Sequence, residues 1–151
     1  MTILPALVLY SLLLQDSVAF RVEVPPAVPA GRPVPIVLRL TNKTERPLTL
    51  ALRGRPIAFD VTVAREDGSV RWRRLEGAVV PAILAVRTLE PAESLVFETA
   101  WSGRLGDGSP APPGRYSVTG MLPTDTPEGL QTLPAALRLL PPGEQAPIPG
   151  E

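Results

Sequence analysis

Residues 59–72 read FDVTVAREDGSVRW, and this stretch decides the fold class of the chain. Apolar side chains occupy every second position of its first arm, which is the pattern of a strand with one buried face. Asp67-Gly68 then marks a tight turn, because such turns need a positive φ that glycine tolerates. A second strand returns to Trp72. The stretch predicts a β-hairpin whose apolar face belongs to the core of an all-β domain.

Alternating patterns continue on both sides of this hairpin, with an apolar interlude from Val79 to Leu89. Turn signals separate the patterns at a spacing of roughly ten residues, so about seven to eight short antiparallel strands are expected to form a β-sandwich. The further predicted strands are residues 18–24, 36–41, 48–52, 95–101, 116–120 and 133–139. We expect the core to centre on Phe59, Val61, Trp72, Phe97 and Trp101.

The chain divides into three parts, of which residues 17–140 hold all the predicted strands. Residues 1–16 contain the apolar run Ile3–Leu14, which has the length of a signal-peptide core and is short for a membrane span. We interpret it as an export or membrane-tethering segment, although no basic residue precedes it. A cytoplasmic protein with an over-extended start or a loose N-terminal strand is the alternative. Residues 141–151 hold four prolines and two glycines and predict a disordered tail.

The composition excludes several classes of function. The 15 basic and 15 acidic residues balance to zero, and no basic stripe is interleaved with aromatics, which argues against nucleic acid as a partner. The chain has no cysteine and no histidine. It therefore has no disulfide, no Ser-His or Cys-His nucleophile and no ordinary zinc site, and it lacks a glycine-rich phosphate loop. We expect no metal, no cofactor and no enzymatic activity.

Paired carboxylates are the remaining route to acid-base catalysis. The acidic residues of the predicted domain lie near turns or on alternate strand faces, where we expect solvated charges: Asp60, Glu66, Asp67, Glu76, Glu98 and Asp107. A Ser-Lys pair would depend on Lys43, which lies in a predicted turn. Neither arrangement favours an enzyme.

Two local motifs each have two interpretations. Residues 42–44 (NKT) match a glycosylation sequon, but an asparagine that opens a turn explains the same residues. Residues 113–116 (PGRY) are consistent with a tyrosine corner, in which a tyrosine hydroxyl bonds back to the main chain. A half-buried strand aromatic at Tyr116 is the other interpretation.

A longer set of residues resembles a known family. It comprises FDVTV at 59–63, Asp67-Gly68, VRW at 70–72, LEPAE at 89–93, Phe97, Trp101 and PGRYSV at 113–118. This order is similar to the BsuPI-type intracellular proteinase inhibitor domain, over about Val18 to Leu140. The resemblance implies a small immunoglobulin-like antiparallel β-sandwich and, by the family's name, inhibition of a subtilisin-type serine protease.

The chain departs from the family pattern at three places. Ala92 stands where the turn usually carries glycine, and residues 73–75 (RRL) follow Trp72 where an aromatic residue or serine is expected. The apolar N-terminus fits poorly with an intracellular protein. The first two departures leave the expected fold intact, whereas the third concerns the identity of the target.

The resemblance implies a protein-binding module whose partner is a subtilisin-type serine protease. The alternative is a non-inhibitory structural or adhesive sandwich at the cell envelope, with the N-terminal run in contact with the membrane; an enzyme is the third hypothesis. An export signal would favour the envelope module. A start close to Asp16 would favour the inhibitor.

Two loops are the candidates for the protein-binding site, because a rigid exposed loop loses little entropy when it binds. Residues 102–109 form the longest predicted loop and carry Arg104 and Leu105 at the apparent tip, although the glycines around them predict flexibility. Residues 53–57 form a shorter loop that is stiffened by proline and carries Arg55 and Ile57. Strand addition along a sheet edge is a third route. Both loops can equally be solvated connections without a partner.

Overall fold

The computed structural model describes residues 16–144, and the eleven secondary-structure elements within this range are all strands. They are β1 (Val18–Glu23), β2 (Ala27–Pro29), β3 (Val34–Asn42), β4 (Leu48–Arg53), β5 (Asp60–Arg65), β6 (Val70–Arg73), β7 (Leu84–Leu89), β8 (Ser94–Trp101), β9 (Gly114–Leu122), β10 (Leu130–Gln131) and β11 (Ala135–Leu140). The expected export segment, up to residue 15, and residues 145–151 of the expected disordered tail lie outside the described range. Between residues 16 and 144 no helix is long and apolar enough to cross a membrane.

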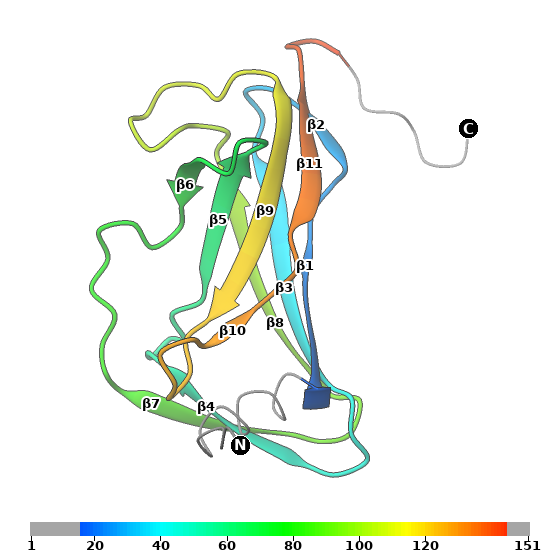
Figure 1. The fold of residues 1–151 in the computed structure, drawn as a ribbon, viewed down its shortest axis with the longest axis vertical. Coiled ribbons are helices and arrows are strands. Elements are labelled where there is room, and N and C mark those ends of the chain that lie inside the picture. The colour runs from blue at the N-terminus through cyan, green and yellow to red at the C-terminus, as the bar shows by residue number, and fades with distance from the viewer. Residues whose placement is uncertain (1–15, 145–151) are drawn as a thin grey trace, which may run out of the picture.

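Two sheets face each other and form a sandwich (Figure 1). One has the strand order β1-β3-β8 and the other the order β2-β11-β9-β5-β6, with the short β10 paired to β9. Neighbours such as β5 and β9 are far apart in the sequence, as in the Greek-key connections of immunoglobulin-like domains. The predicted all-β, immunoglobulin-like sandwich is confirmed. One pair departs from the antiparallel prediction, since β2 runs parallel to β11.

The core lies between the two sheets, and β3 contributes more to it than the sequence suggested. Alternate residues of this strand, from Val34 to Leu40, are completely buried. Trp101 is also completely buried, and its ring lies 6.3 Å from that of Trp72 and 5.8 Å from that of Tyr116. Of the five expected core residues, Trp72 and Phe97 are only partly buried and pack against the margin of the cluster.

Gly120 on β9 lies directly against Leu38 of the facing sheet. A methyl group at this position would overlap the side chain of Leu38 on β3. The absence of a side chain therefore lets Leu38 fill the space between the layers. Alternation along β9 continues through Tyr116 and Val118, both of which are buried.

Three strands were not predicted: β2, β7 and β10. Strand β7 lies in the apolar interlude and pairs with β4 as a separate two-stranded sheet, which crosses the lower end of the sandwich in Figure 1. Only Ala85 and Leu89 of β7 are buried, so the strand lacks the period-2 pattern that would have revealed it. The last strand begins later than predicted, and Leu133 is 86% exposed. Pro134 has no N–H for the sheet ladder, which explains why pairing starts beyond it.

The structure decides between the two interpretations of each local motif, at residues 42–44 and 113–116. Asn42 is buried, and its side-chain amide donates hydrogen bonds to the carbonyl oxygens of Arg46 and Leu89, at 2.8 and 2.9 Å. Since both amide hydrogens are used, the turn interpretation is confirmed and the sequon interpretation is wrong. The Tyr116 hydroxyl donates to the carbonyl oxygen of Pro112 at 2.6 Å, which confirms the tyrosine corner. Burial raises the pKa of this hydroxyl.

Ala92 adopts a backbone conformation that usually favours glycine. Its φ is 65°, the one positive φ of a non-glycine residue among residues 16–144. Its N–H donates to the carbonyl oxygen of Asn42 at 3.0 Å, which holds the turn to the end of β3. The left-handed conformation costs alanine roughly 1–2 kcal/mol, and the fold tolerates this cost.

Candidate functional site

The first predicted contact loop, residues 102–109, is called the glycine loop here. It folds back on itself, because Leu105 N donates to Ser109 O at 2.8 Å and Gly108 N donates to Leu105 O at 2.9 Å. The Asp107 carboxylate accepts hydrogen bonds from the hydroxyl and the N–H of Ser109, at 2.5 and 2.9 Å. These bonds lower the pKa of Asp107. The loop is closed by its own hydrogen bonds, which restrain it although it is rich in glycine.

The glycine loop is also fastened to the sandwich. Trp101 Nε1 donates to the carbonyl oxygen of Arg104 at 2.7 Å, and Gly106 N donates to the carbonyl oxygen of Arg71 on β6 at 2.9 Å. Leu105 packs against the core cluster. The tip of the loop therefore lies beyond Leu105, at residues 106–108, and not at Arg104 and Leu105 as the sequence suggested. Arg104 is exposed, and its guanidinium donates to Gly108 O at 2.9 Å.

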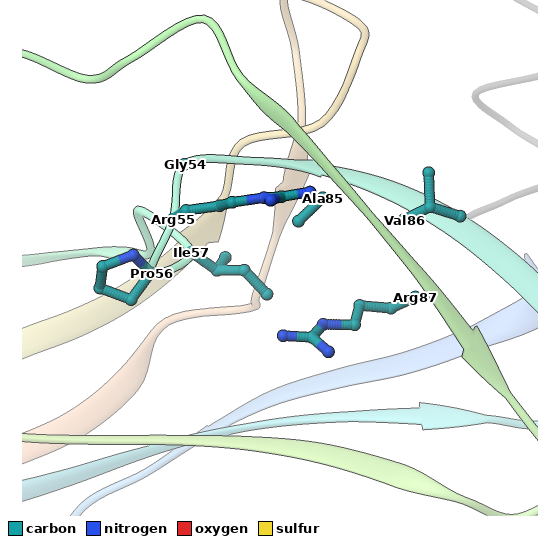
Figure 2. Close-up of a pocket in the computed structure, with 7 residues that line it drawn as sticks. All are labelled: Gly54, Arg55, Pro56, Ile57, Ala85, Val86 and Arg87. Carbon is teal, nitrogen blue, oxygen red and sulfur yellow. The ribbon is translucent and has the colours of Figure 1, made fainter.

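The second predicted loop, residues 53–57, is a tight turn at the end of β4. Gly54 has a φ of 96°, and a methyl group there would lie 2.8 Å from Pro56 O, so the turn requires glycine. Arg55 is exposed, whereas Ile57 packs against the core. Figure 2 shows both side chains in a groove of about 400 Å³ that is also lined by Arg87 of β7.

The structure brings the predicted residues together as two separate pairs. Arg104 and Leu105 belong to the loop at the upper end of the sandwich in Figure 1, and Arg55 and Ile57 belong to the turn near its lower end. One small contact surface cannot include both pairs. Whether either pair binds a partner stays a prediction.

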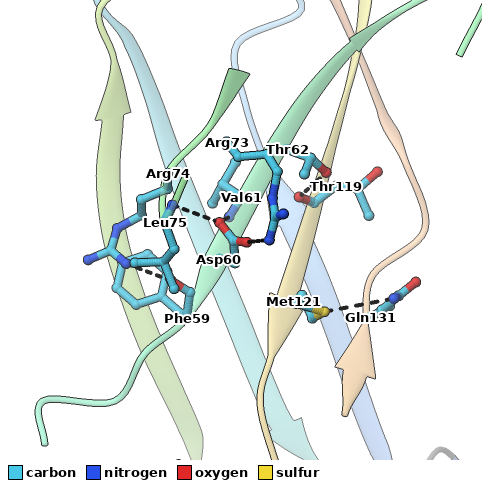
Figure 3. A network of polar contacts seen from close by, with 10 residues as sticks. All are labelled: Phe59, Asp60, Val61, Thr62, Arg73, Arg74, Leu75, Thr119, Met121 and Gln131. Atoms are coloured by element: carbon cyan, nitrogen blue, oxygen red, sulfur yellow. Dashed lines mark hydrogen bonds and ion pairs between the residues drawn. The ribbon is translucent and has the colours of Figure 1, made fainter. Parts of the chain in front are cut away.

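A buried carboxylate between the two loops was missed. Asp60 is 2% exposed, so the expectation that it is a solvated charge is wrong. Its Oδ1 accepts hydrogen bonds from the N–H groups of Val61 and Leu75, at 2.8 and 3.1 Å, and its Oδ2 accepts from Arg73 Nη2 at 2.7 Å (Figure 3). The Asp60 carboxylate raises the pKa of Arg73. No local pattern revealed this burial, because the partners that cover the Asp60 carboxylate come from residues 73–75.

The same network holds the chain that leaves β6. The Arg74 guanidinium donates to the carbonyl oxygen of Phe59 at 2.6 Å and lies 3.7 Å from the centre of its ring (Figure 3). Arg74 N also donates to the carbonyl oxygen of Val61 at 2.9 Å. Residues 73–75, which depart from the family pattern, are thus bound to residues 59–61 by side-chain and main-chain contacts. They fix the direction in which the following segment starts.

That segment is exposed and apolar, and it was not among the predicted contact loops. Residues 77–86 (GAVVPAILAV), called the apolar segment here, contain no charged side chain. Five of the eight exposed large hydrophobic residues in the described part of the chain lie in it: Val79, Val80, Ile83, Leu84 and Val86. Figure 1 shows the chain between β6 and β7 running down the outside of the sandwich. An apolar run in a sequence usually indicates core, which is why its exposure could not be foreseen.

Neither a metal-ligating cluster nor an uncommitted buried carboxylate lies in the described part of the chain. Residues 16–144 contain no group of three or more His, Cys, Asp or Glu side chains arranged to hold a metal ion. The buried carboxylate of Asp60 is committed to main-chain and guanidinium donors.

Comparison with known families identifies the family to which the chain belongs. Residues 21–126 match the BsuPI family, described as intracellular proteinase inhibitor. The match covers more than half of the 151 residues. The chain belongs to the BsuPI family of intracellular proteinase inhibitors.

Solved structures show only distant likenesses. They include the alkylpurine DNA glycosylase AlkC from Pseudomonas fluorescens bound to DNA containing an abasic site analog (14% identity, TM-score 0.46, 82% of this chain and 30% of that chain). A CARDB domain from Pyrococcus furiosus in complex with di-metal ions has 11% identity and a TM-score of 0.42, with coverage of 82% of this chain and 87% of that chain. A β-glucosidase from Erythrobacter marinus has 10% identity and a TM-score of 0.43, with coverage of 82% and 15%.

The chain spans less than a third of the glycosylase and less than a fifth of the glucosidase. These likenesses are too distant to bear on function. No curated protein matches the chain significantly.

Proposed function

We propose that this protein binds and inhibits a subtilisin-type serine protease. The observation that carries the proposal is the match of residues 21–126 to a family of proteinase inhibitors. Two features of the structure support it. The sandwich core is fully buried at its centre, and specific hydrogen bonds hold the glycine loop and the start of the segment that follows β6. A scaffold of this kind restrains its surface loops before binding, which lowers the entropy lost in a complex.

The experiment is a titration of the full chain against a subtilisin-type protease with a small chromogenic peptide as substrate. We expect stoichiometric loss of activity at micromolar concentration or below, with the inhibitor chain still intact on a gel after prolonged incubation. An aspartic protease serves as the control and should stay active. Full protease activity in the presence of excess protein would contradict the proposal for this class of target. Transient inhibition that ends as the chain is cut would show a substrate and not an inhibitor.

A further inference from the structure

The surface of the described residues has one dense apolar region. Eight large hydrophobic side chains are exposed on the whole of this surface, and five of them fall within the ten residues of the apolar segment. Val79 is 92% exposed, more than any of the others. Single exposed hydrophobic residues are normal, but a contiguous group usually marks an interaction site.

The main chain in the middle of this region also lacks hydrogen-bond partners within the described part of the chain. Residues 79–82 make no main-chain hydrogen bond to any described residue, whereas Ala78 N donates to Leu75 O and Gly54 N donates to Ile83 O on either side. The segment therefore presents free N–H and C=O groups between two fixed points. An extended peptide with free main-chain groups is what a strand-adding partner binds.

The sequence of the segment favours an extended conformation before any partner arrives. Pro81 has a fixed φ, and the residue before a proline is restricted to the extended region, which here is Val80. Proline also lacks the N–H needed for a continuous sheet edge, which disfavours uncontrolled pairing between copies of the chain. These features favour binding of the segment, as an extended peptide, to one partner at a time.

Both ends of the segment are anchored to the sandwich. On the N-terminal side, Asp60 holds Arg73 and Leu75 at 2.7 and 3.1 Å. On the C-terminal side, β7 pairs with β4 from Leu84 onward. A segment held at both ends loses less conformational freedom on binding than a free peptide of the same sequence.

From these observations we infer that the apolar segment enters the substrate cleft of the inhibited protease as an extended strand, with Val79 and Val80 as its apolar anchors. This inference rests on the proposed function and identifies the surface that performs it. The partner is a serine protease whose subsites accept apolar side chains, since the ten residues carry no charge. A protease with an acidic pocket for basic side chains does not fit the segment. Arg104 and Arg55 lie outside the contact.

The test compares two surface variants of the full chain against a subtilisin-type protease. The double variant Val79→Asp, Val80→Asp places a charge on both sides of the extended strand. One of the two charges therefore faces the cleft whichever side of the strand binds. Leu133→Asp is the matched control, because Leu133 is also highly exposed, at 86%, and lies outside the apolar segment. We expect the double variant to weaken inhibition by at least about 100-fold and the control to leave it unchanged. Thermal unfolding of both variants should match the parent.

A second measurement needs no variant. Hydrogen exchange of the parent with and without the protease should show new protection of the Val79, Val80 and Ala82 amides, while the amides of the glycine loop stay unchanged. This readout also decides the matter if the double variant fails to fold.

The outcomes separate the inference from the proposed function. Inhibition by the parent with no effect of the double variant and no protection of the segment overturns the inference and leaves the function standing. No inhibition by the parent overturns the function and the inference together. A parent dimer that the double variant converts to a monomer, without any change in inhibition, would assign the segment to self-association and overturn its assignment to the protease.

Discussion

The glycine loop and the apolar segment are neighbours with opposite organisation. Gly106 of the glycine loop lies close to Glu76, the residue before the apolar segment, since a methyl group on Gly106 would lie 3.4 Å from Glu76 Oε2. The glycine loop closes on itself with main-chain and side-chain hydrogen bonds and turns Leu105 toward the core. The apolar segment leaves residues 79–82 without a main-chain partner among the described residues and turns its valines outward.

This difference shows that residue composition alone can mislead: a glycine-rich loop is closed by hydrogen bonds, and an apolar run is exposed. Glycines lower the cost of the positive φ angles on which the turns of a closed loop depend, as at Gly103 and Gly108. Apolar residues need not be core when their main chain crosses the surface between two anchors. The contacts beyond each segment decide its behaviour: Trp101 and Arg71 for the glycine loop, Asp60 and β4 for the apolar segment.

The largest expected effect comes from Trp101→Ala, which removes the support of the glycine loop together with the largest buried side chain. Truncation of a buried aromatic residue costs about 3–5 kcal/mol, out of a total stability that is usually about 5–15 kcal/mol. Urea unfolding should show this loss, and hydrogen exchange should rise at the hydrogen-bonded amides of the glycine loop. Trp101→Phe, which keeps a ring but loses the bond to Arg104 O, is the control and should cost less. A melting temperature within a degree or two of the parent would contradict the core assignment.

The next largest effect is expected from Asp60→Ala, which releases the chain at the start of the apolar segment. Leu75 N and Val61 N lose their acceptor, and an unsatisfied buried donor costs roughly 1–3 kcal/mol. The ion pair adds little, because the Arg73 side chain is 48% exposed. Urea unfolding measures the loss. Hydrogen exchange should rise at Leu75 and Ala78 while the glycine loop stays protected.

Asp60→Asn is the matched variant, since an amide oxygen can still accept from the two N–H groups, and its cost should be smaller. Equal costs for the two substitutions would show that the negative charge, and not the accepting oxygen, holds the start of the apolar segment.

A smaller effect is expected from Tyr116→Phe, at the point where the chain after the glycine loop enters β9. The ring stays buried and only the hydroxyl that donates to Pro112 O is lost, so we expect about 0.5–1.5 kcal/mol. Urea unfolding at neutral pH measures the difference. A phenylalanine variant as stable as the parent would mean that solvent satisfies Pro112 O and that the tyrosine corner contributes no net stability.

The fold could be predicted from the sequence where burial follows the strand period. The alternation of the first hairpin arm and of β3 revealed strands, and the PGRY motif pointed to the tyrosine corner as one of two interpretations. Strand β7 could not be found, because only two of its six residues face the core. Proline and glycine signals located most turns but gave no information on what each turn contacts.

The candidate site was less accessible to prediction than the fold. Exposure and main-chain pairing depend on distant segments, such as Gly54 with Ile83 and Gly106 with Arg71. No local pattern encodes these pairings, so Leu105 was placed at a tip and residues 79–82 were passed over. Asp60 illustrates the same limit, since a carboxylate at an outward strand position became buried only because residues 73–75 return to cover it.

The smallest expected effect concerns the acid sensitivity of the glycine loop. Hydrogen bonds from the Ser109 hydroxyl and N–H lower the pKa of Asp107 in the folded protein, and Ser69 lowers the pKa of Asp67 in the hairpin turn in the same way. A carboxyl whose pKa is lower in the folded state stabilises the fold above its unfolded pKa of about 3.9, and this contribution is lost as the pH falls through the lowered value. Both groups are fully exposed, so the effect is small.

Asp107→Asn keeps an accepting oxygen but removes the titration, and Asp67→Asn does the same in the hairpin turn, outside the glycine loop. The melting temperature of the parent should exceed that of Asp107→Asn near pH 6, and the difference should shrink as the pH falls below about 4 and the parent carboxyl takes up its proton. Hydrogen exchange then separates the regions, since Asp107→Asn should loosen Ser109 and leave Ser69 protected, and Asp67→Asn should do the reverse. A difference in melting temperature that does not change with pH would show that the bonds to Ser109 do not depend on the charge of Asp107, and the closed state of the glycine loop would then rest on its main-chain bonds alone.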